Sequence, residues 1–331
     1  MGKQELRGQV AIVTGASSGV GWQCAVRLAE QGVRLCVTAR RHEALEELRQ
    51  LLEARGAECL VVAGDVSEQE DVDNVVRQCV ERYGRVDILV NDAAVQSYGL
   101  FEELPWEHIT RTFDVTCFGY MRFARAVLPH FRSQRGGHII NVLSMLSKGA
   151  APLLSVYAAA KHALLGWQKS LTLELKGSGI QVSGVLVPSV STPMFDHAPT
   201  QLVRAPKPLP PVYEPDVAAR CVVRCALYPG RTRVPVFLQG WLMLFADTVV
   251  PFVGNAIMAR WGVPMQQRPE PISRPDGNLF HSTPEGVGQY GSVPPTPRWV
   301  RAGMTAGVLA AGLGLVGSVL LGGRELARAV R

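Results

Sequence analysis

The sequence lacks the cysteine and histidine patterns of disulfide frameworks and metal sites. Its seven cysteines are scattered, odd in number and without paired spacing, and its seven histidines form no metal-ligand pattern. Scattered cysteines of this kind favour reduced thiols. Metal-dependent catalysis is therefore not indicated, and no metal-binding residue is predicted.

The chain also lacks an apolar segment ahead of its first predicted strand. Residues 1–7 are mostly polar, so no secretory signal is predicted and we expect synthesis in the cytosol. Despite a net charge of +6, no basic stripe with interleaved aromatic residues is present, which argues against a nucleic-acid partner. Attraction to anionic lipid explains the basic balance at least as well.

A glycine-rich turn follows the first apolar run, Val10 to Val13, which predicts a buried parallel strand. The turn, Thr14 to Gly21, has the spacing Gly-x-x-x-Gly-x-Gly and leads into an apolar-periodic helix. Such turns are often only structural, but between a strand and a helix they favour pyrophosphate binding by backbone N–H groups. The predicted cofactor-binding residues of this turn are Gly15, Ser17, Ser18, Gly19 and Gly21.

The end of the second predicted strand, Leu35 to Thr38, lacks the acidic residue that usually binds the ribose hydroxyls of NAD. Arg40 and Arg41 stand there instead. Because guanidinium groups suit a 2′-phosphate, NADP(H) is favoured over NAD(H), with Arg40 as the predicted ligand. For Arg41, solvation of the next helix, predicted from Arg41 to Arg55, is an equally good interpretation.

Tyr157 and Lys161 are four residues apart, about one helical turn, and so lie on one helix face. A cation beside a phenol lowers the phenol pKa from about 10 toward working pH, which makes the tyrosine a proton donor and acceptor. The same spacing also occurs in simple surface pairs. Ser144 stands thirteen residues before Tyr157, after a strand predicted at His138 to Val142.

In this order the motifs resemble the short-chain dehydrogenase/reductase family, over roughly residues 6 to 240. Further motifs that carry the resemblance are Asp65-Val66, Asn91-Asp92-Ala93-Ala94 and Pro188 to Pro193. The resemblance implies that Tyr157 is the catalytic acid/base and that Ser144 donates a hydrogen bond to the substrate carbonyl. It also implies that Lys161 lowers the pKa of Tyr157 and binds the nicotinamide ribose.

The resemblance implies further cofactor contacts along the strand ends. Asp65 and Val66 are expected to flank the adenine, Asn91 to support the central strand and the cofactor, and Thr192 to hold the nicotinamide carboxamide. Pro188 and Val190 complete the predicted cofactor-binding residues.

Four positions depart from the pattern of the family. Thr116 replaces an asparagine that helps to hold a proton-relaying water, and a threonine hydroxyl has fewer hydrogen-bonding sites for that task. Asp92 and Ala94 replace Asn and Gly, and Ser189 replaces Gly. These changes add Cβ atoms or alter a polar support where the family binds its cofactor.

Alternation of apolar runs and helical stretches predicts an α/β fold with a doubly wound parallel sheet, of Rossmann type, over residues 1–262. The six predicted strands lie near Val10, Leu35, Leu60, Ile88, Ile139 and Val182. Helices are expected at Gln69 to Tyr83 and Trp106 to Phe131. By resemblance, the proline-rich stretch from Pro199 to Pro215 is the substrate loop.

The C-terminal third changes character. Residues 234–261 are strongly apolar and predict a last strand with an apolar cap or an interfacial helix, while residues 263–301 predict a proline-rich linker or surface wrap. Residues 302–323 carry no charge, and a helix of this length, about 33 Å, can span a bilayer. A transmembrane anchor with a basic tail, residues 324–331, is therefore predicted; the alternative is a helix packed on the protein.

Together these features predict a membrane-anchored, NADP(H)-dependent oxidoreductase with its catalytic domain in the cytoplasm. Its substrate would be the carbonyl or secondary alcohol of a lipophilic small molecule. The alternative is a membrane-anchored NADP(H)-binding protein with little or no turnover, which the departures at Asp92, Ala94, Thr116 and Ser189 motivate. By resemblance, a homodimer or homotetramer is expected.

Overall fold

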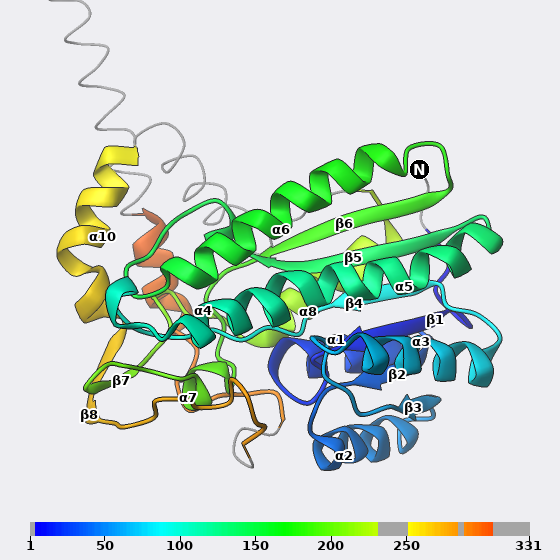
Figure 1. Ribbon diagram of the computed structural model, residues 1–331, viewed down its shortest axis with the longest axis horizontal. Helices are drawn as coiled ribbons and strands as arrows, with labels where there is room; N and C mark the ends of the chain where they lie inside the picture. Colours follow the sequence, from blue (N-terminus) through cyan, green and yellow to red (C-terminus); the bar gives the residue numbers. More distant parts are fainter. Residues whose placement is uncertain (1–3, 231–250, 284–287, 307–331) are drawn as a thin grey trace, which may run out of the picture.

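One parallel six-stranded sheet forms the centre of the protein (Figure 1). The computed structural model describes residues 4–230, 251–283 and 288–306. The strand order is β3-β2-β1-β4-β5-β6, so the predicted doubly wound parallel sheet is confirmed. The strands are β1 (Val10–Thr14), β2 (Arg34–Thr38), β3 (Cys59–Val61), β4 (Ile88–Asn91), β5 (Gly137–Ser144) and β6 (Ile180–Val187).

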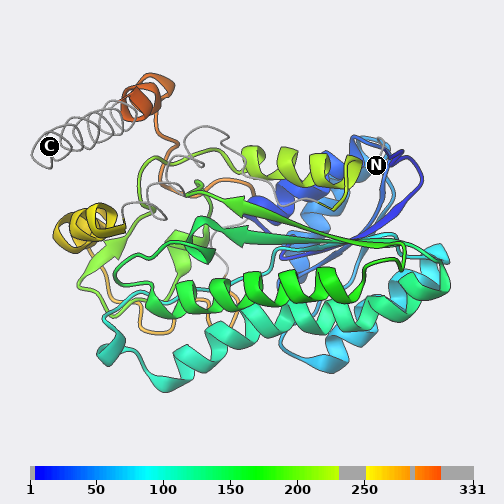
Figure 2. The ribbon, with the colours of Figure 1, turned by 90° about the horizontal axis from the view of Figure 1, so that it is seen from above.

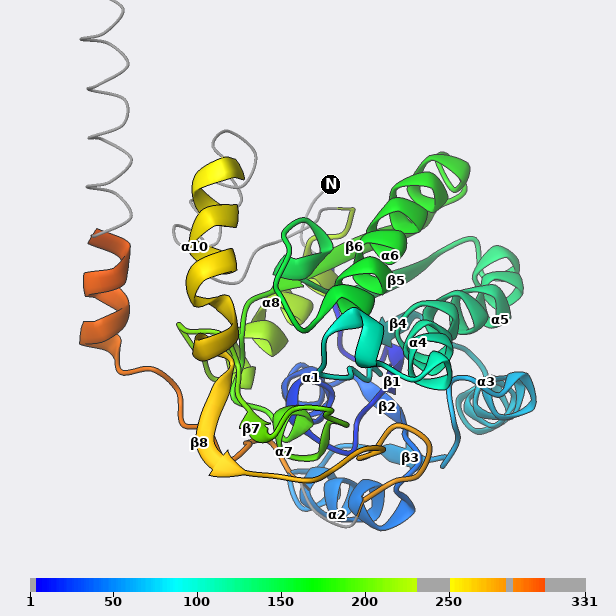
Figure 3. The ribbon, with the colours of Figure 1, turned by 60° about the vertical axis from the view of Figure 1, so that its left-hand side comes forward.

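Helices cover both faces of this sheet, as Figure 3 shows. Helices α1, α2 and α8 pack their apolar side chains on one face, and α3, α5 and α6 pack on the other. Because both faces are covered, β1 is buried along its whole length, as its β-branched sequence predicts. The helices are α1 (Gly19–Ala29), α2 (His42–Glu53), α3 (Gln69–Tyr83), α4 (Trp106–Phe113), α5 (Gly119–Ser133), α6 (Ser155–Glu174), α7 (Met194–His197), α8 (Pro215–Leu227) and α10 (Pro251–Met265).

The strand order reverses between β1 and β4, and this reversal creates the crevice in which the site lies. Ile12 of β1 pairs with Cys36 of β2 on one side and with Leu89 of β4 on the other. The connections after β1 and β4 therefore leave toward opposite faces of the sheet. In open parallel sheets, ligands bind in the crevice beyond the carboxyl ends of such strands.

A π-helical turn, Asp114–Phe118, interrupts the predicted helix from Trp106 to Phe131. It contains Thr116, whose hydroxyl donates to the Val95 carbonyl over 2.9 Å and accepts from the Val95 N–H over 3.0 Å. The side chain thus satisfies backbone groups of the chain after β4. Turns of this kind are frequent near functional sites.

The C-terminal part returns to the carboxyl edge of the sheet (Figure 2). Strand β8 (Gln267–Pro271) pairs antiparallel with β7 (Arg204–Pro206), and the chain then crosses the mouth of the crevice. We call residues 276–283 and 288–296 the C-terminal strap. In the strap, Leu279 is fully buried, and Thr296 exchanges two hydrogen bonds of 2.8 Å with the backbone of Val212.

The predicted membrane anchor finds no support in the described chain. Within the residues that the structure describes, no helix is long and apolar enough to cross a bilayer. Residues 298–306 are helical, but residues 307–323 of the predicted anchor, the tail at 324–331 and residues 234–250 of the apolar segment lie outside the described residues.

A buried histidine between β5 and β6 makes the stability of the fold depend on pH. His138 is 4% exposed, its Nε2 lies 2.9 Å from the Ser183 hydroxyl, and its Nδ1 has no partner. Burial lowers the pKa of His138 to about 3. Below the ordinary histidine pKa of about 6.5, the unfolded chain therefore binds a proton that the folded chain excludes.

We expect the free energy of unfolding to fall by about 2 kcal/mol between pH 6.5 and 5 through His138, since one pKa unit corresponds to about 1.4 kcal/mol. Urea denaturation at both pH values measures the difference. The His138→Gln variant should lose this part of the pH dependence, whereas the exposed control His162→Gln should keep it. Equal pH dependence in His138→Gln and wild type would contradict the assignment.

Candidate functional site

A cavity of about 300 Å³ lies at the carboxyl ends of the strands, and most of the predicted site residues line it. Those that line it are Gly15, Ser17, Ser18, Gly19, Arg40, Asp65, Val66, Ser144, Tyr157, Lys161, Pro188, Val190 and Thr192. Two predicted residues do not line it. Gly21 packs beneath the turn, and Asn91 is buried behind it, where its Nδ2 donates to the Asn141 side chain over 3.0 Å.

The glycine turn is packed too closely for side chains. A Cβ on Gly21 would lie 2.4 Å from the Gly15 carbonyl oxygen, and Gly15 has a positive φ of 68°. At the start of α1, the Gly19 N–H donates to the Gly288 carbonyl over 2.9 Å. Among the described residues no partner is found for the Val20 N–H, and Val20 lines the cavity. A free helix-start N–H beside a close-packed turn fits a pyrophosphate.

Two guanidinium groups stand where the chain leaves β2 and border this cavity. Arg40 and Arg41 both line it, and Arg41 also donates to the Ser17 hydroxyl over 3.3 Å. Burial lowers the pKa of Arg40, against the attraction of the Asp65 carboxylate. Planar guanidiniums are well suited to a phosphate.

Asp65 is fixed by neighbours on its own loop and on α4. Its carboxylate accepts from the Ser67 N–H over 3.0 Å and from Arg111 over 2.5 Å. Although burial acts in the opposite direction, these hydrogen bonds and the Arg111 charge hold the pKa of Asp65 below its usual value. Asp65, held in this way, and Val66 both line the cavity.

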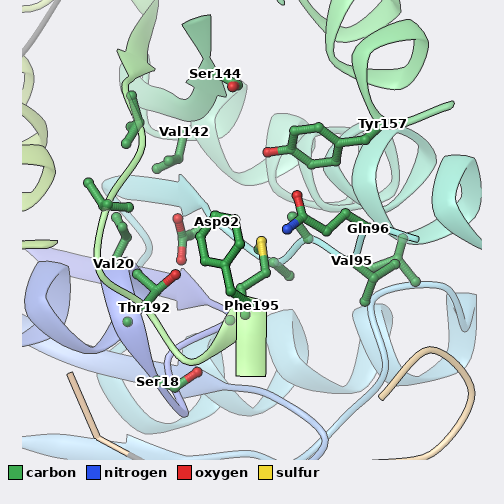
Figure 4. Close-up of a pocket in the computed structure, with 18 of the residues that line it drawn as sticks. Ser18, Val20, Asp92, Val95, Gln96, Val142, Ser144, Tyr157, Thr192 and Phe195 are labelled. Atoms are coloured by element: carbon green, nitrogen blue, oxygen red, sulfur yellow. The ribbon is translucent and has the colours of Figure 1, made fainter. Parts of the chain in front are cut away.

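Ser144 and Tyr157 meet at the other end of the cavity. Ser144 ends β5, and its hydroxyl accepts from the Leu146 N–H over 3.1 Å. Tyr157 lies in the first turn of α6, and the Ser144 hydroxyl acts to lower the pKa of its phenol. Figure 4 shows the Tyr157 phenol directed into the space bounded by Ser144, Asp92 and Gln96. A proton donor and a hydrogen-bonding hydroxyl therefore face one point.

Lys161 is held by groups other than the Tyr157 hydroxyl. Its Nζ donates to the Tyr120 hydroxyl over 3.1 Å and to the Val142 carbonyl over 2.9 Å, and lies 5.7 Å from the Tyr157 ring centroid. Burial raises the pKa of Tyr157, the Ser144 hydroxyl opposes this shift, and the Asp92 carboxylate adds to it. The expected lowering of this pKa toward neutrality is thus not seen in the protein alone, because burial disfavours the charged phenolate.

Asp92 is the carboxylate counterpart of Lys161. It lines the same cavity, and the Gly21 N–H at the start of α1 acts to lower its pKa. Burial raises the pKa of the Asp92 carboxyl and lowers that of the Lys161 ammonium, and each group opposes the shift of the other. The substitution that the sequence marks as a departure therefore places an acid beside the site lysine.

A family model described as short chain dehydrogenase matches residues 9–202, more than half of the 331-residue chain. The chain belongs to the short-chain dehydrogenase/reductase family. This confirms the resemblance found in the sequence. It is an oxidoreductase of this family, whose members bind a nicotinamide cofactor, and the glycine turn and guanidiniums described above fit such a group.

Individual relatives belong to the same broad class. "Uncharacterized oxidoreductase YxnA" of Bacillus subtilis is 34% identical over 69% of this chain and 65% of its own length. "Fatty acyl-CoA reductase" of Acinetobacter baylyi is 30% identical over 78% of this chain and 85% of its own length. An "Uncharacterized oxidoreductase" of Thermotoga maritima is 35% identical over 54% of this chain and 70% of its own length. The chain therefore spans about two thirds of YxnA and more of the reductase.

Sequence reasoning missed two parts of this short-chain dehydrogenase/reductase site. Tyr120 lies one helical turn after Thr116, so its place on the same face was open to inference from spacing. The strap residues Asn278, Ser282 and Thr283 also line the cavity. No local sequence pattern predicts their contact with residues about 240 positions earlier in the chain.

We expect Gly21→Ala to weaken nicotinamide-cofactor binding at least about tenfold, because the added Cβ would displace the turn by its contact with the Gly15 carbonyl. Gly166→Ala is the matched control, since nothing lies within 4 Å of its added Cβ. Titration of both variants with NADPH and NADH by nicotinamide fluorescence measures the effect, with circular dichroism as a check of folding. Unchanged affinity in folded Gly21→Ala would contradict this account of the turn.

Proposed function

We propose that this chain is an NADP(H)-dependent oxidoreductase that interconverts a carbonyl and an alcohol on a lipophilic small molecule. The observation that carries the proposal is the meeting of Ser144, Tyr157 and Lys161 in one cavity with the glycine turn and Arg40. Membership of an oxidoreductase family favours this function over cofactor binding without turnover.

In the proposed reaction, Tyr157 donates its phenolic proton to the carbonyl oxygen during reduction and accepts it back during oxidation. Ser144 holds the same oxygen by a hydrogen bond, which stabilises negative charge as it develops. The bound nicotinamide supplies or accepts the hydride. Lys161, anchored by Tyr120 and Val142, holds its Nζ 5.7 Å from the centroid of the Tyr157 ring and would bind a ribose hydroxyl of the cofactor.

NADP(H) is the proposed cofactor because two arginines and no acid follow β2. Gly15, Ser17, Ser18, Gly19 and the free Val20 N–H would hold the phosphates, with Gly21 supporting the turn. Arg40 would bind the 2′-phosphate. Asp65 and Val66 would flank the adenine. Further proposed cofactor contacts are Asn91, Pro188, Val190 and Thr192.

A lipophilic substrate is proposed from the apolar lining beyond Tyr157. The side chains there are Tyr98, Met145, Leu146, Leu154, Met194, Phe195 and Leu209. Tyr98 is fully buried, with its ring centroid 6.4 Å from that of Phe195. The name of the Acinetobacter relative, a fatty acyl-CoA reductase, is consistent with an alkyl chain in this position.

Association with a membrane also remains a proposal, which rests on the uncharged sequence at 302–323. Ahead of that sequence, Trp299 is 78% exposed, and Trp261 of α10 is 52% exposed. Exposed tryptophans near basic residues such as Arg298 are typical of surfaces that meet lipid headgroups.

We expect Tyr157→Phe to lower kcat for aldehyde or ketone reduction by a factor of about 100 to 10,000, the usual range for loss of a general acid. NADPH affinity should change by less than about threefold, because the ring itself is retained. A panel of long-chain aldehydes and ketones with NADPH measures turnover, and Tyr228→Phe, outside the cavity, is the control. Full turnover in Tyr157→Phe would rule out the assigned acid.

Arg40→Ala should weaken NADPH binding about tenfold or more and leave NADH binding within about threefold, since only NADPH carries the 2′-phosphate. Fluorescence titration with both nucleotides gives the ratio. The control is Arg49→Ala, which removes the same charge from the solvent side of α2. Equal losses for both nucleotides would mean that Arg40 does not discriminate between them.

A further inference from the structure

The C-terminal strap lies across the adenosine end of the cavity. Asn278, Ser282 and Thr283 line the same space as Asp65 and Arg40, which come from the loops after β3 and β2. The family match ends at residue 202, so the strap belongs to no part of the chain that the family model covers. The strap is therefore an element of this chain added to the site that the family match covers.

Backbone carbonyls of the strap bind the arginines at this end. Arg40 donates to the Asn278 carbonyl over 2.6 Å and to the Leu279 carbonyl over 3.1 Å. Arg111 donates to the same Leu279 carbonyl over 3.1 Å, and Arg41 donates to the Thr283 carbonyl over 3.4 Å. The strap is thus hydrogen-bonded to the side chains that border the nucleotide site.

Apolar packing of Leu279 also fixes the strap on the protein core. The Leu279 side chain is fully buried in the same core cluster as Val66 and Val115, both of which line the cavity. Next to it, the Asp276 carboxylate lies 3.3 Å from Nε2 of His108. Burial of a leucine side chain stabilises the attachment of the strap more than one polar contact made by a largely exposed carboxylate.

The second part of the strap is attached on the other side of the glycine turn. The Gly288 carbonyl accepts from the Gly19 N–H over 2.9 Å. Farther along, the Ser292 N–H donates to the Asp196 carboxylate over 2.7 Å. The two parts of the strap therefore bracket the turn that would hold the pyrophosphate.

We propose that the C-terminal strap is a wall of the dinucleotide site, and that bound NADP(H) cannot leave until this wall detaches. This inference rests on the proposed function. The cavity remains open between Asp65 and Val66 on one side and Asn278 and Thr283 on the other, so the strap bounds the adenosine space without filling it. The Val20 N–H also stays available with the strap in place. These features favour a wall over a segment that competes with the cofactor.

The test is the rate at which NADPH dissociates, followed as loss of nicotinamide fluorescence when the full-length protein is mixed with excess NADP⁺. Leu279→Ala removes the buried anchor and should speed dissociation at least about tenfold. Asp276→Asn, a milder change that keeps the core intact, should speed it about threefold and covers the case in which Leu279→Ala does not fold. The exposed strap residue His281 supplies the control, His281→Ala, whose rate should match wild type.

Three results would overturn the proposal. Unchanged rates in both strap variants would show that the strap does not limit release, and slower release with tighter binding would show that it competes with the cofactor. If the wild-type protein bound neither NADPH nor NADH, both the proposed function and the proposed role of the strap would be wrong. If it bound NADPH but all variants released it at the same rate, only the proposed role of the strap would be wrong.

Discussion

Parallel pairing of β1 with both β2 and β4 is the constraint on which the site depends. Because the two neighbours of β1 belong to different halves of the sheet, the chain beyond β1 and the chain beyond β4 separate and leave a crevice. The Thr14 hydroxyl joins the two ends by accepting from the N–H groups of Asp92 and Ala93 over 3.0 and 3.2 Å. The glycine turn and Asp92 take their positions from this junction.

Burial of charge shapes the chemistry within that crevice. Lys161 is 2% exposed, and an ammonium at such a position requires hydrogen-bond acceptors and a counter-charge. Tyr120, the Val142 carbonyl and Asp92 meet this requirement. The Thr116 hydroxyl is hydrogen-bonded to the backbone of Val95. It is therefore engaged differently from the water-holding asparagine that the family pattern has at this position. Of the departures from the family pattern, Asp92 thus acts on the lysine through its charge, whereas Thr116 binds the backbone after β4.

Local patterns in the sequence were sufficient for the strands and the glycine turn, because each depends on residues close together in one strand or turn. The approach of Ser144 to Tyr157 joins a strand to a helix, and only the resemblance to the family implied it. Local patterns were not sufficient to predict the pKa of Tyr157. This pKa depends on how completely burial removes water from the phenol, and the spacing of residues in the sequence does not reveal that. The bond from Arg40 to the Leu279 carbonyl joins residues 239 apart and leaves no periodic signature. The predicted anchor lies largely beyond the described residues.

The great sequence separation between the strap and the glycine turn has a consequence for biosynthesis. All six strands of the sheet are present in the chain once residue 187 has been made, and α8 is complete at Leu227. The strap follows some fifty residues later and is bonded to a turn formed near the N-terminus. On the ribosome, the sheet can therefore assemble while this side of its crevice is still uncovered, and the strap can cover it only after residues 276–296 have been made.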